Sequence, residues 1–472
     1  MTSEQDVLQQ ACSYALEYIR GLDRRSVAAT VGLAELRARL GGDLPATGAS
    51  ATSVIDDLVS ATEGGQLGSA SGRFFAWVIG GALPAALAAD WLASTWDVNA
   101  TMYACGPAAA VVEEVAGAWV KEVLDLPREA SFAFTTGCQM AHMTGLAAAR
   151  HAILRDAGWD VEVDGLAGAP PIRVLANDLG HGSIERALRY LGLGTRSRQL
   201  LPADSFGRIA PETLRNALEG PRQPTILILD AGDLNLGAFD HFEELIPMAK
   251  AVCAWVHVDG AFGLWARASA RYRHLAEGID QADSWATDAH KWLNTPQDSG
   301  LAVVRDREAH RASMTVSASY LTVAGDARDA IDWTPDWTRR ARGYAVYAAL
   351  RELGRSGVAA LVDRCCAYAD TLARGIGDLK GAELMAPATL NQALVRFPDP
   401  RSPDPLAHDR HTDAVIAAVN ATGEAFFSGT TWRGRRAMRI SVCNWQTSPE
   451  DVERTLHSVA AVLAQERDSF LE

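Results

Sequence analysis

Short apolar segments alternate with longer stretches of helical periodicity through the middle of the chain, from about residue 100 to residue 310. The short segments are rich in apolar residues, as is typical of strands whose two faces are both covered. We predict strands at Ser131–Thr136, Ile172–Ala176, Thr225–Leu229, Ala254–Asp259, Ser284–Thr287 and Leu301–Val304, and helices at Gly137–Leu154, Ser183–Leu191 and Phe242–Val252. This alternation predicts an α/β domain with a mainly parallel sheet and helices on both faces.

The two ends of the chain have other patterns. Near the N-terminus we predict helices at Glu4–Gly21 and Val31–Leu40, joined by Gly/Ala/Ser-rich linkers at Gly41–Ser53 and Gly64–Gly72. Their apolar faces need a surface to cover them, so we expect residues 1–99 to be an arm that packs on a partner subunit. Residues 100–340 are then a large domain.

Beyond Arg339 the pattern predicts a smaller α+β domain, residues 341–472. Its predicted elements are helices at Tyr344–Leu353, Gly357–Leu372 and Asp451–Ala464, strands at Ala393–Phe397 and Met438–Val442, and a polar loop at Pro398–Arg410. Ser448-Pro449-Glu450-Asp451 is a strong helix start, with Ser448 as N-cap and acids near the positive end of the helix dipole.

The composition is that of a globular protein and argues against some classes of partner. The 472 residues are 48% hydrophobic and 22% charged, which is typical of a soluble globular chain. A formal net charge of −14 argues against binding to nucleic acid and to anionic membrane surfaces. The apolar run Phe74–Ala89 is too short for a membrane span and contains Pro84, so we expect a buried helix or an interface there.

The seven cysteines are scattered, with no CxxC motif and no Cys/His ligand spacing. We therefore predict reduced thiols and no metal site. The first residues carry neither a basic segment nor an apolar one of the kind found in signal peptides, which favours a cytoplasmic location.

The segment Asp283–Asn294 contains the first candidate for chemistry, Lys291, which lies between Trp285 and Trp292. Burial in so apolar a segment disfavours the charged amine and lowers its pKa, which makes a lysine nucleophilic enough to form an imine. A lysine at a strand end with its amine in solvent is the alternative.

Asp259, 32 residues before Lys291, favours the chemical interpretation. It ends a predicted buried strand, and α/β proteins place their sites at the carboxyl ends of strands. A lysine that forms an imine and an aspartate that pairs with a pyridinium nitrogen are the two protein groups that a pyridoxal phosphate (PLP) site most needs.

Three further polar turns follow predicted strands. The junction Thr135–Gln139 opens a helix, whose free N–H groups suit a phosphate. His181 lies in the loop before Ser183, where an imidazole could stack on an aromatic ring or simply cap the helix. The glycine-containing turn Asp230–Asp240 could contribute to a site or be an ordinary loop.

Several motifs together resemble one enzyme family. They are Gly106-Pro107 with Glu113, Leu126-Pro127, Gly137 with Ala148-Ala149-Arg150, His181-Gly-Ser-Ile-Glu-Arg186, Gly237-Ala-Phe-Asp240, His257-Val-Asp259-Gly-Ala261, His290-Lys291-Trp292 and Arg439-Ile-Ser-Val-Cys-Asn444. From about Phe74 to the C-terminus the chain resembles the group II PLP-dependent amino-acid decarboxylases, the family of the aromatic-L-amino-acid, glutamate and diaminobutyrate decarboxylases.

The resemblance implies fold type I, with a mainly parallel seven-stranded sheet in the PLP-binding large domain. It implies that Lys291 forms the imine, that Asp259 keeps the pyridine nitrogen protonated, and that Ala261 and His181 lie against opposite faces of the ring. The positions that fall on or beside its phosphate contacts are Cys138, Gln139, Asp233, Asp288 and His290.

The resemblance also implies a homodimer with the active site at its interface. Phe75, Trp77 and Tyr103 align with stretches that line the family's substrate pocket, in part from the neighbouring subunit. These aromatics favour an aromatic substrate, although packing at a dimer interface explains them equally well.

Tyr320 falls where the family holds the tyrosine that returns a proton to Cα after CO₂ leaves. We therefore expect decarboxylation of an L-amino acid to an amine and CO₂. Alternatives are another PLP reaction on the same scaffold (transamination, aldehyde formation or a Cα–Cβ bond reaction) and a non-catalytic protein that binds PLP or a partner.

The chain departs from the family pattern near the cofactor. Gln139 replaces a small residue in the phosphate turn, and Met140 and His142 replace a Glu/Asn pair. Asp233 stands where Thr or Asn is usual, and Asp288 stands where Asn is frequent. Two carboxylates near a phosphate dianion are unfavourable unless they are protonated, offset by cations or turned away.

Overall fold

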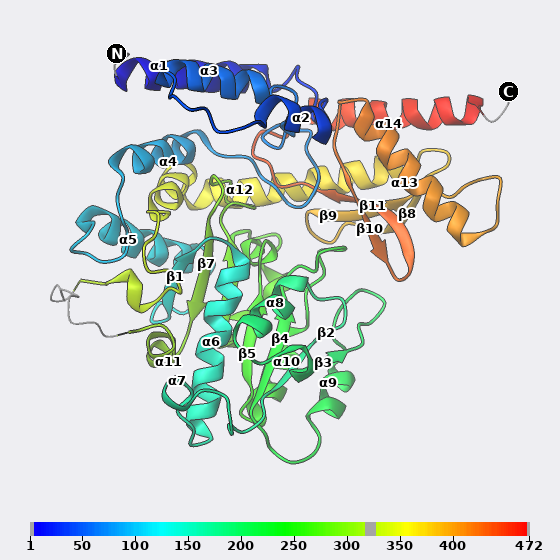
Figure 1. Cartoon of the computed structure of the whole chain (residues 1–472). Helices are drawn as coiled ribbons and strands as arrows, with labels where there is room; N and C mark the ends of the chain where they lie inside the picture. The colour runs from blue at the N-terminus through cyan, green and yellow to red at the C-terminus, as the bar shows by residue number, and fades with distance from the viewer. Residues whose placement is uncertain (1–3, 317–326, 470–472) are drawn as a thin grey trace. The chain divides into compact units, whose positions relative to one another are not determined.

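The structure is a computed structural model that describes residues 4–316 and 327–469 (Figure 1). The chain divides into two compact units. The larger unit comprises Gly80–Asp370 and Ala386–Ala393, and the smaller unit comprises Met1–Ile79, Thr371–Met385 and Leu394–Glu472. The predicted three-part division by role, 1–99, 100–340 and 341–472, stays a prediction, because compactness alone does not assign dimerisation or cofactor binding.

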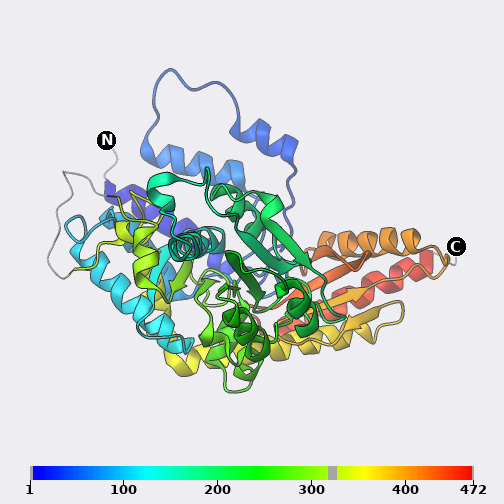
Figure 2. The same cartoon turned by 90° about the horizontal axis from the view of Figure 1, so that it is seen from below.

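A seven-stranded sheet forms the centre of the larger unit (Figures 1 and 2). Its strands are β1 (Ser131–Thr135), β2 (Arg173–Asn177), β3 (Arg198–Leu201), β4 (Thr225–Asp230), β5 (Trp255–Asp259), β6 (Ser284–Asp288) and β7 (Gly300–Val304). Their order is β1-β7-β6-β5-β4-β2-β3, and β7 runs antiparallel to both of its neighbours while the pairs from β6 to β3 are parallel. The mainly parallel α/β sheet predicted from the sequence is confirmed.

The helices of the larger unit fill the connections between strands. They are α4 (Pro84–Trp96), α5 (Pro107–Val123), α6 (Cys138–Asp156), α7 (Val161–Asp164), α8 (Gly182–Tyr190), α9 (Pro211–Leu218), α10 (Phe242–Ala251) and α11 (Arg307–Ala312), while α12 (Gly343–Gly377) begins in this unit and ends in the other. Helix α6 is rich in alanine and buried along much of its length, and it packs on β5, β6 and β7. Small side chains let it approach the sheet closely, which sets the position of its first turn.

The smaller unit combines helices with a four-stranded sheet of order β10-β11-β9-β8. Its elements are α1 (Glu4–Gly21), α2 (Leu33–Leu40), α3 (Ala51–Thr62), β8 (Glu383–Ala386), β9 (Gln392–Arg396), α13 (Pro405–Ala421), β10 (Ser428–Trp432), β11 (Arg435–Ser441) and α14 (Pro449–Ser469). The predicted helix start at Ser448 is confirmed, since its hydroxyl accepts a hydrogen bond from Asp451 N at 3.1 Å.

Two predicted loops in the smaller unit are shorter than expected. The loop predicted at Pro398–Arg410 ends at Asp404, whose carboxylate accepts from Leu406 N and begins α13. The linker predicted at Gly41–Ser53 ends at Ser50, which caps α3 through Ser53 N. Both helices start from capping side chains, a local signal that outweighs the polar composition around it.

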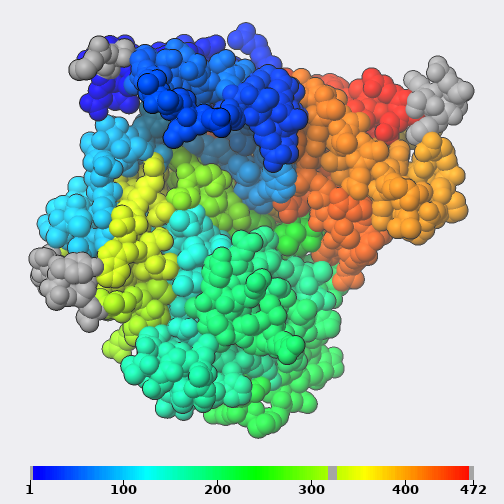
Figure 3. Space-filling model, in the orientation of Figure 1, coloured from blue at the N-terminus to red at the C-terminus, as the bar shows by residue number. Residues whose placement is uncertain are grey.

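The N-terminal helices expose apolar side chains. No residue of α1, α2 or α3 is buried, and Figure 3 shows these helices in blue at the surface. The exposed apolar residues on them are Leu8, Leu16, Ile19, Leu33, Leu40, Val54 and Leu58. Among the described residues, no helix has an apolar stretch long enough to cross a bilayer.

A buried ion pair joins three segments of the larger unit. Arg339 Nη1 lies 2.6 Å from Glu113 Oε1 on α5, and the two side chains are 0% and 3% exposed. The same guanidinium donates to the carbonyls of Ala100 and Phe134, each at 2.9 Å. The contacts fix Arg339 against β1 and against the start of the larger unit, and they offset the cost of burying its charge.

We expect Glu113→Ala to lower the free energy of unfolding by about 3–5 kcal/mol, because it leaves the Arg339 charge buried without its carboxylate. Glu122→Ala is the matched control on the same helix, since it removes an exposed partner of Arg355 and should cost less than about 1 kcal/mol. Urea unfolding followed by tryptophan fluorescence measures both. Equal midpoints for the two variants would contradict the role assigned to the buried pair.

Candidate active site

The two residues proposed for cofactor chemistry lie at the carboxyl ends of neighbouring parallel strands. Asp259 ends β5 and pairs in register with Ala286 of β6, and Lys291 follows the end of β6 by three residues. The amine and the carboxylate are close enough that each shifts the pKa of the other. The structure therefore brings together the pair that the sequence predicted to act on one cofactor.

Asp288, the last residue of β6, connects Lys291 to helix α6. Its Oδ2 lies 3.1 Å from Lys291 Nζ, and its Oδ1 accepts a hydrogen bond from Cys138 N at 2.6 Å. His290 Nε2 is 3.7 Å from the same Oδ1. A carboxylate at this point is thus offset by an ammonium group and by the N-terminus of a helix, which resolves the unfavourable charge noted in the sequence.

The pKa of Lys291 differs from the sequence-based expectation. Burial alone lowers the pKa of this amine, as predicted, but the negative charges of Asp288 foremost, and then of Cys138 and Asp259, raise it above its usual value. The prediction of a lowered pKa is therefore wrong for the chain without its cofactor. Nearby anions outweigh desolvation here, because Asp288 is in direct contact with the amine.

Asp259 has the electrostatic character that a pyridinium partner needs. Burial favours its protonated form, but His142 above all, followed by Lys291 and His181, holds the pKa of this carboxyl well below its usual range. Its Oδ1 accepts from Ala261 N at 3.1 Å, which fixes the carboxylate and positions Ala261 beside it. An ionised carboxylate that is fixed in one orientation at the end of β5 is suited to hold a protonated ring nitrogen.

His142 is the site residue whose role sequence reasoning missed. It lies on α6 and is fully buried, and its Nε2 lies 3.3 Å from Asp259 Oδ2. Its side chain meets those of Cys138 and Asp259, since one polar atom or sulfur from each of the three lies within 4.8 Å of the other two. The helical spacing from Cys138 to His142, one turn, was the available signal, because it places both side chains on one face of α6.

His181 begins helix α8 as its N-cap. Its Nδ1 accepts from Ser183 N at 3.2 Å and lies 2.7 Å from Ser183 Oγ. This side chain is exposed, and its charge is one of those that lower the pKa of Asp259. The capping role considered for His181 is present, and the ring also lies near the carboxylate that would hold the pyridine.

Asp233 holds the turn after β4. Its carboxylate accepts four hydrogen bonds, of 2.8–3.2 Å, from the backbone N–H groups of Asn235, Leu236 (one to each oxygen) and Ala238. The charge of this second acid is therefore offset by backbone donors, so an aspartate in this turn need not repel a nearby phosphate.

Four buried polar side-chain atoms, at the start of α6 and on the segments before and after Lys291 in sequence, have no hydrogen-bond partner in the described part of the chain. They are Gln139 Nε2, Thr287 Oγ1, Thr295 Oγ1 and Ser299 Oγ. Gln139 follows Cys138 at the start of α6, and Ser299 N donates to His290 Nδ1 at 3.1 Å. Buried donors are rarely left unsatisfied, so these atoms fit a phosphate that takes their hydrogen bonds.

The start of α6 is also fixed by a close approach of two backbones. A Cβ built on Gly300, the first residue of β7, would lie 2.5 Å from backbone atoms of Gly137. Any side chain at position 300 would therefore push the start of α6 away from the end of β6. Gly300 thus sets the distance between Cys138 N and Asp288.

The residues proposed to contact substrate fall in different parts of the chain. Phe75 and Trp77 belong to the smaller unit, where Phe75 stacks on Phe427 with 5.3 Å between ring centroids and Trp77 is 48% exposed. Tyr103 belongs to the larger unit, and its N–H donates to Asp329 Oδ1 at 2.7 Å. Tyr320 lies outside the described residues.

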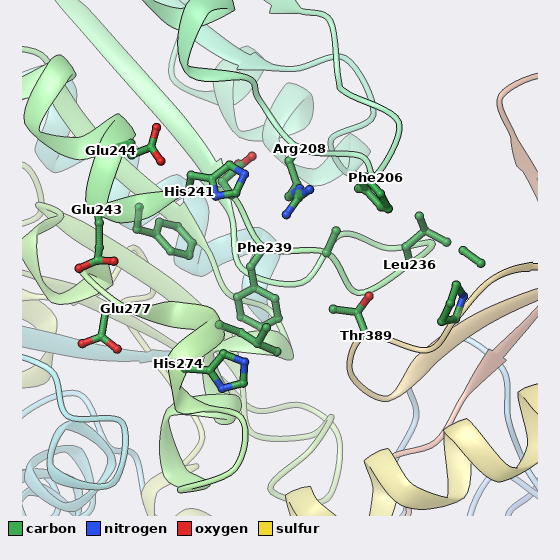
Figure 4. Close-up of a pocket in the computed structure, with 16 residues that line it drawn as sticks. Phe206, Arg208, Leu236, Phe239, His241, Glu243, Glu244, His274, Glu277 and Thr389 are labelled. Atoms are coloured by element: carbon green, nitrogen blue, oxygen red, sulfur yellow. The ribbon is translucent and has the colours of Figure 1, made fainter.

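A separate cavity of about 420 Å³ opens beside the Asp233 turn (Figure 4). The residues that Figure 4 labels around it include Phe206, Arg208, Phe239, His241 and His274. Neither Lys291 nor Asp259 lines this cavity, so we do not assign the cofactor to it.

Fold and site together define a class of protein: an α/β protein with a mainly parallel sheet and with a lysine and an aspartate close together at the carboxyl edge of that sheet. The model of one family, described as "Pyridoxal-dependent decarboxylase conserved domain", matches residues 35–398, more than half of the chain. The chain therefore belongs to the pyridoxal-dependent decarboxylase family. It is a carboxy-lyase whose cofactor is pyridoxal 5′-phosphate.

Individual relatives agree with this membership. The chain is 30% identical over 389 residues to L-2,4-diaminobutyrate decarboxylase of Rhizobium meliloti (strain 1021), a match that covers 79% of this chain and 74% of the relative. It is 25% identical over 466 residues to aromatic-L-amino-acid decarboxylase of Bacillus atrophaeus, covering 97% and 94%. The crystal structure of Oryza sativa TDC with PLP and tryptamine has the same fold, with a TM-score of 0.91 at 23% identity over 98% of each chain.

We expect Asp288→Asn to lower the pKa of the Lys291 amine in the cofactor-free protein, because the substitution removes the charge that most opposes the effect of burial. The pH dependence of acetylation at Lys291, followed by mass spectrometry of the digested protein, measures this pKa. Asp298→Asn is the control, since Asp298 bonds to Arg342 instead. A Lys291 pKa that is the same in the Asp288 variant and the unmodified protein would contradict the assigned contact.

Proposed function

We propose that the chain decarboxylates an L-amino acid, with an aromatic side chain preferred, to the amine and CO₂. The observation that carries the proposal is the placement of Lys291 and an ionised Asp259 at the carboxyl ends of β5 and β6, where one pyridine ring can contact both. The family membership supports the reaction class.

Bound PLP supplies an electron-accepting ring for the electrons that the departing carboxylate leaves behind. The chain's own residues set that chemistry up. Asp259 would hold a proton on the ring nitrogen, and the amine of Lys291 would hold the cofactor covalently in the absence of substrate. Asp288 is placed to hold a proton on the Lys291 amine whenever that amine is free, since its Oδ2 is 3.1 Å from Nζ.

The groups around these two residues position the rest of the cofactor. Ala261 and His181 would lie against the two faces of the ring. Gln139, Asp233 and His290 would contact or border the phosphate, while Cys138 and Asp288 fix the start of α6 beside it. The unpartnered donors near Lys291 support this end of the site as the phosphate end.

The preference for an aromatic substrate is supported by Phe75, Trp77 and Tyr103, which align with pocket-lining stretches of the family. The names of the relatives include aromatic-L-amino-acid and diaminobutyrate decarboxylases. We infer an aromatic substrate because side chains of this kind bind aromatic rings and offer no charge for a second amino group.

We also propose a cytoplasmic homodimer whose active site lies at its interface. The exposed apolar side chains of α1, α2 and α3 support the dimer, because they need a covering surface. Reduced cysteines support the compartment: Cys12, Cys105, Cys138, Cys253, Cys365, Cys366 and Cys443 are all free.

A panel of amino acids tests the proposed reaction. We expect purified holoenzyme to release CO₂ and amine from tryptophan, tyrosine or phenylalanine faster than from 2,4-diaminobutyrate or glutamate, measured by mass spectrometry of both products. Lys291→Ala and Asp259→Ala should each lower turnover by at least about 10³-fold, a loss comparable to removing a residue on which catalysis depends. Keto acid or aldehyde as the main product, or turnover in either variant close to that of the unmodified enzyme, would refute the proposal.

The role proposed for Tyr320 needs a separate measurement. We expect Tyr320→Phe to release CO₂ while forming less amine per CO₂, because the substitution removes the hydroxyl that would return a proton to Cα. Substrate consumed, CO₂ and amine are quantified in one reaction. An unchanged ratio of amine to CO₂ would show that Tyr320 does not supply this proton.

A further inference from the structure

A series of buried polar side chains in contact with one another begins at His142, the neighbour of Asp259. His142 Nδ1 on α6 lies 2.9 Å from His257 Nε2 on β5. His257 Nδ1 lies 2.8 Å from Ser284 Oγ on β6, and Trp255 Nε1 donates to that same oxygen at 2.9 Å. His142, His257 and Ser284 are all 0% exposed. We call Trp255, Ser284, His257 and His142 the relay.

The two ends of the relay determine the direction of its hydrogen bonds. An indole N–H can only donate, so Ser284 Oγ accepts from Trp255, but its second lone pair and its own hydrogen still let it accept from His257 Nδ1 or donate to it. The ionised Asp259 at the other end can only accept, so the His142 Nε2 that faces it carries the hydrogen. Burial and the neighbouring His142 lower the pKa of His257 to about 3, so this ring is neutral and carries a single N–H. With one hydrogen on His142, its Nδ1 accepts from His257 Nε2–H, and His257 Nδ1 then accepts from the Ser284 hydroxyl.

His142 is thus arranged with Nδ1 accepting from His257 and with its hydrogen on Nε2, the atom that lies 3.3 Å from Asp259 Oδ2. This contact is electrostatic and not a well-directed hydrogen bond, since Nε2 has no partner of good geometry among the described residues. The opposite direction would turn a nitrogen lone pair toward a carboxylate, which is unfavourable.

Helix α6 makes room for the relay at Gly145. A Cβ at this position would lie 2.9 Å from His257 Cε1 and 3.0 Å from His257 Nδ1. The absence of a side chain at Gly145 therefore permits the His257 ring to stand between β5 and α6, in line with Ser284 on one side and His142 on the other.

We propose that the relay is a positioning device that fixes His142 in the Nε2–H tautomer, so that His142 keeps the Asp259 carboxylate ionised toward the cofactor's ring nitrogen. The inference rests on the proposed role of Asp259. It adds His142, which stands where the family usually has Asn, and three buried residues behind it, His257, Ser284 and Trp255. The relay moves no proton during the reaction; it holds one in place.

Other titratable groups also surround Asp259. They are Lys291 beyond β6, His181 at the start of α8, Cys138 at the start of α6 and Asp230 at the end of β4. Asp230 pairs in register with Asp259, and burial foremost raises the pKa of Asp230 well above its usual value. His142 is the partner that most favours the ionised form of Asp259.

The first test reads the tautomers in the unmodified holoenzyme. Protein labelled with ¹⁵N-histidine, compared with His142→Asn and His257→Gln for assignment, reports which ring nitrogen carries hydrogen. We expect Nε2–H for both His142 and His257. A hydrogen on Nδ1 of either ring would overturn the proposal without reference to activity or to variant stability.

The second test reads the consequence at the cofactor, with PLP labelled with ¹⁵N in its ring. We expect His142→Leu to lower the pH at which the ring nitrogen loses its proton by about one unit or more, the size of shift that one nearby charged or hydrogen-bonding group produces. His142→Asn should leave this pH close to that of the unmodified protein, because an amide can accept from His257 and donate to Asp259. Gly145→Ala presses on His257 and removes no polar atom, and it should lower this pH as His142→Leu does.

His310→Asn is the matched control. His310 is equally buried, its pKa is likewise lowered to about 3 by burial, and it bonds to Ser131 Oγ and to the carbonyl of Trp333, each at 2.8 Å. Its loss should leave unchanged the pH at which the ring nitrogen loses its proton. If this pH is unchanged in both His142→Leu and Gly145→Ala, the proposal for the relay is overturned. Unchanged cofactor binding and ring protonation in Asp259→Asn would instead refute the proposed function of the site.

Discussion

The contact between Asp288 and its two partners holds the active site together. One oxygen accepts from the backbone at the start of α6, and the other contacts the amine of Lys291. The segments that supply these groups are more than a hundred residues apart in sequence, and one carboxylate sets their separation. Asp288 is almost fully buried, so the loss of either partner would leave a buried charge that is not compensated, which is energetically unfavourable. The position of the cofactor end of the sheet therefore depends on this residue as much as on the hydrophobic core beneath it.

Charge matching of this kind recurs through the larger unit. Asp233 satisfies its charge with backbone N–H groups, Asp259 with histidine and lysine, and Glu113 with a buried arginine. Although the formal net charge of the chain is −14, each of these buried acids has its own hydrogen-bond donors or cationic partners. The carboxylates that look out of place in the sequence are compatible with a phosphate-binding site because their local fields are already balanced.

Much of the fold could be predicted from periodicity. Strands β4, β5 and β7 are mainly apolar and are buried on both faces, a pattern typical of strands in the middle of a sheet. Among the elements that were not predicted, β3 and β8 are partly exposed, and α13 begins in a polar, proline-rich stretch whose capping aspartate is easily passed over. For the site, residue type and strand position predicted the lysine and the aspartate. Sequence could not predict the raised pKa of Lys291 or the contact between His142 and His257, because each depends on which side chains from separate elements meet in space.

The close approach of Gly300 to Gly137 has a consequence for how loss of function in this chain should be interpreted. Position 300 has no functional group, yet a single methyl group there would displace the turn from which Cys138 reaches Asp288. In a survey of every possible substitution, Gly300 would therefore show the same intolerance as the lysine that performs the chemistry. Intolerance at such a position reports steric exclusion between two backbones, and it would be misread if every essential residue were taken for a reactive one.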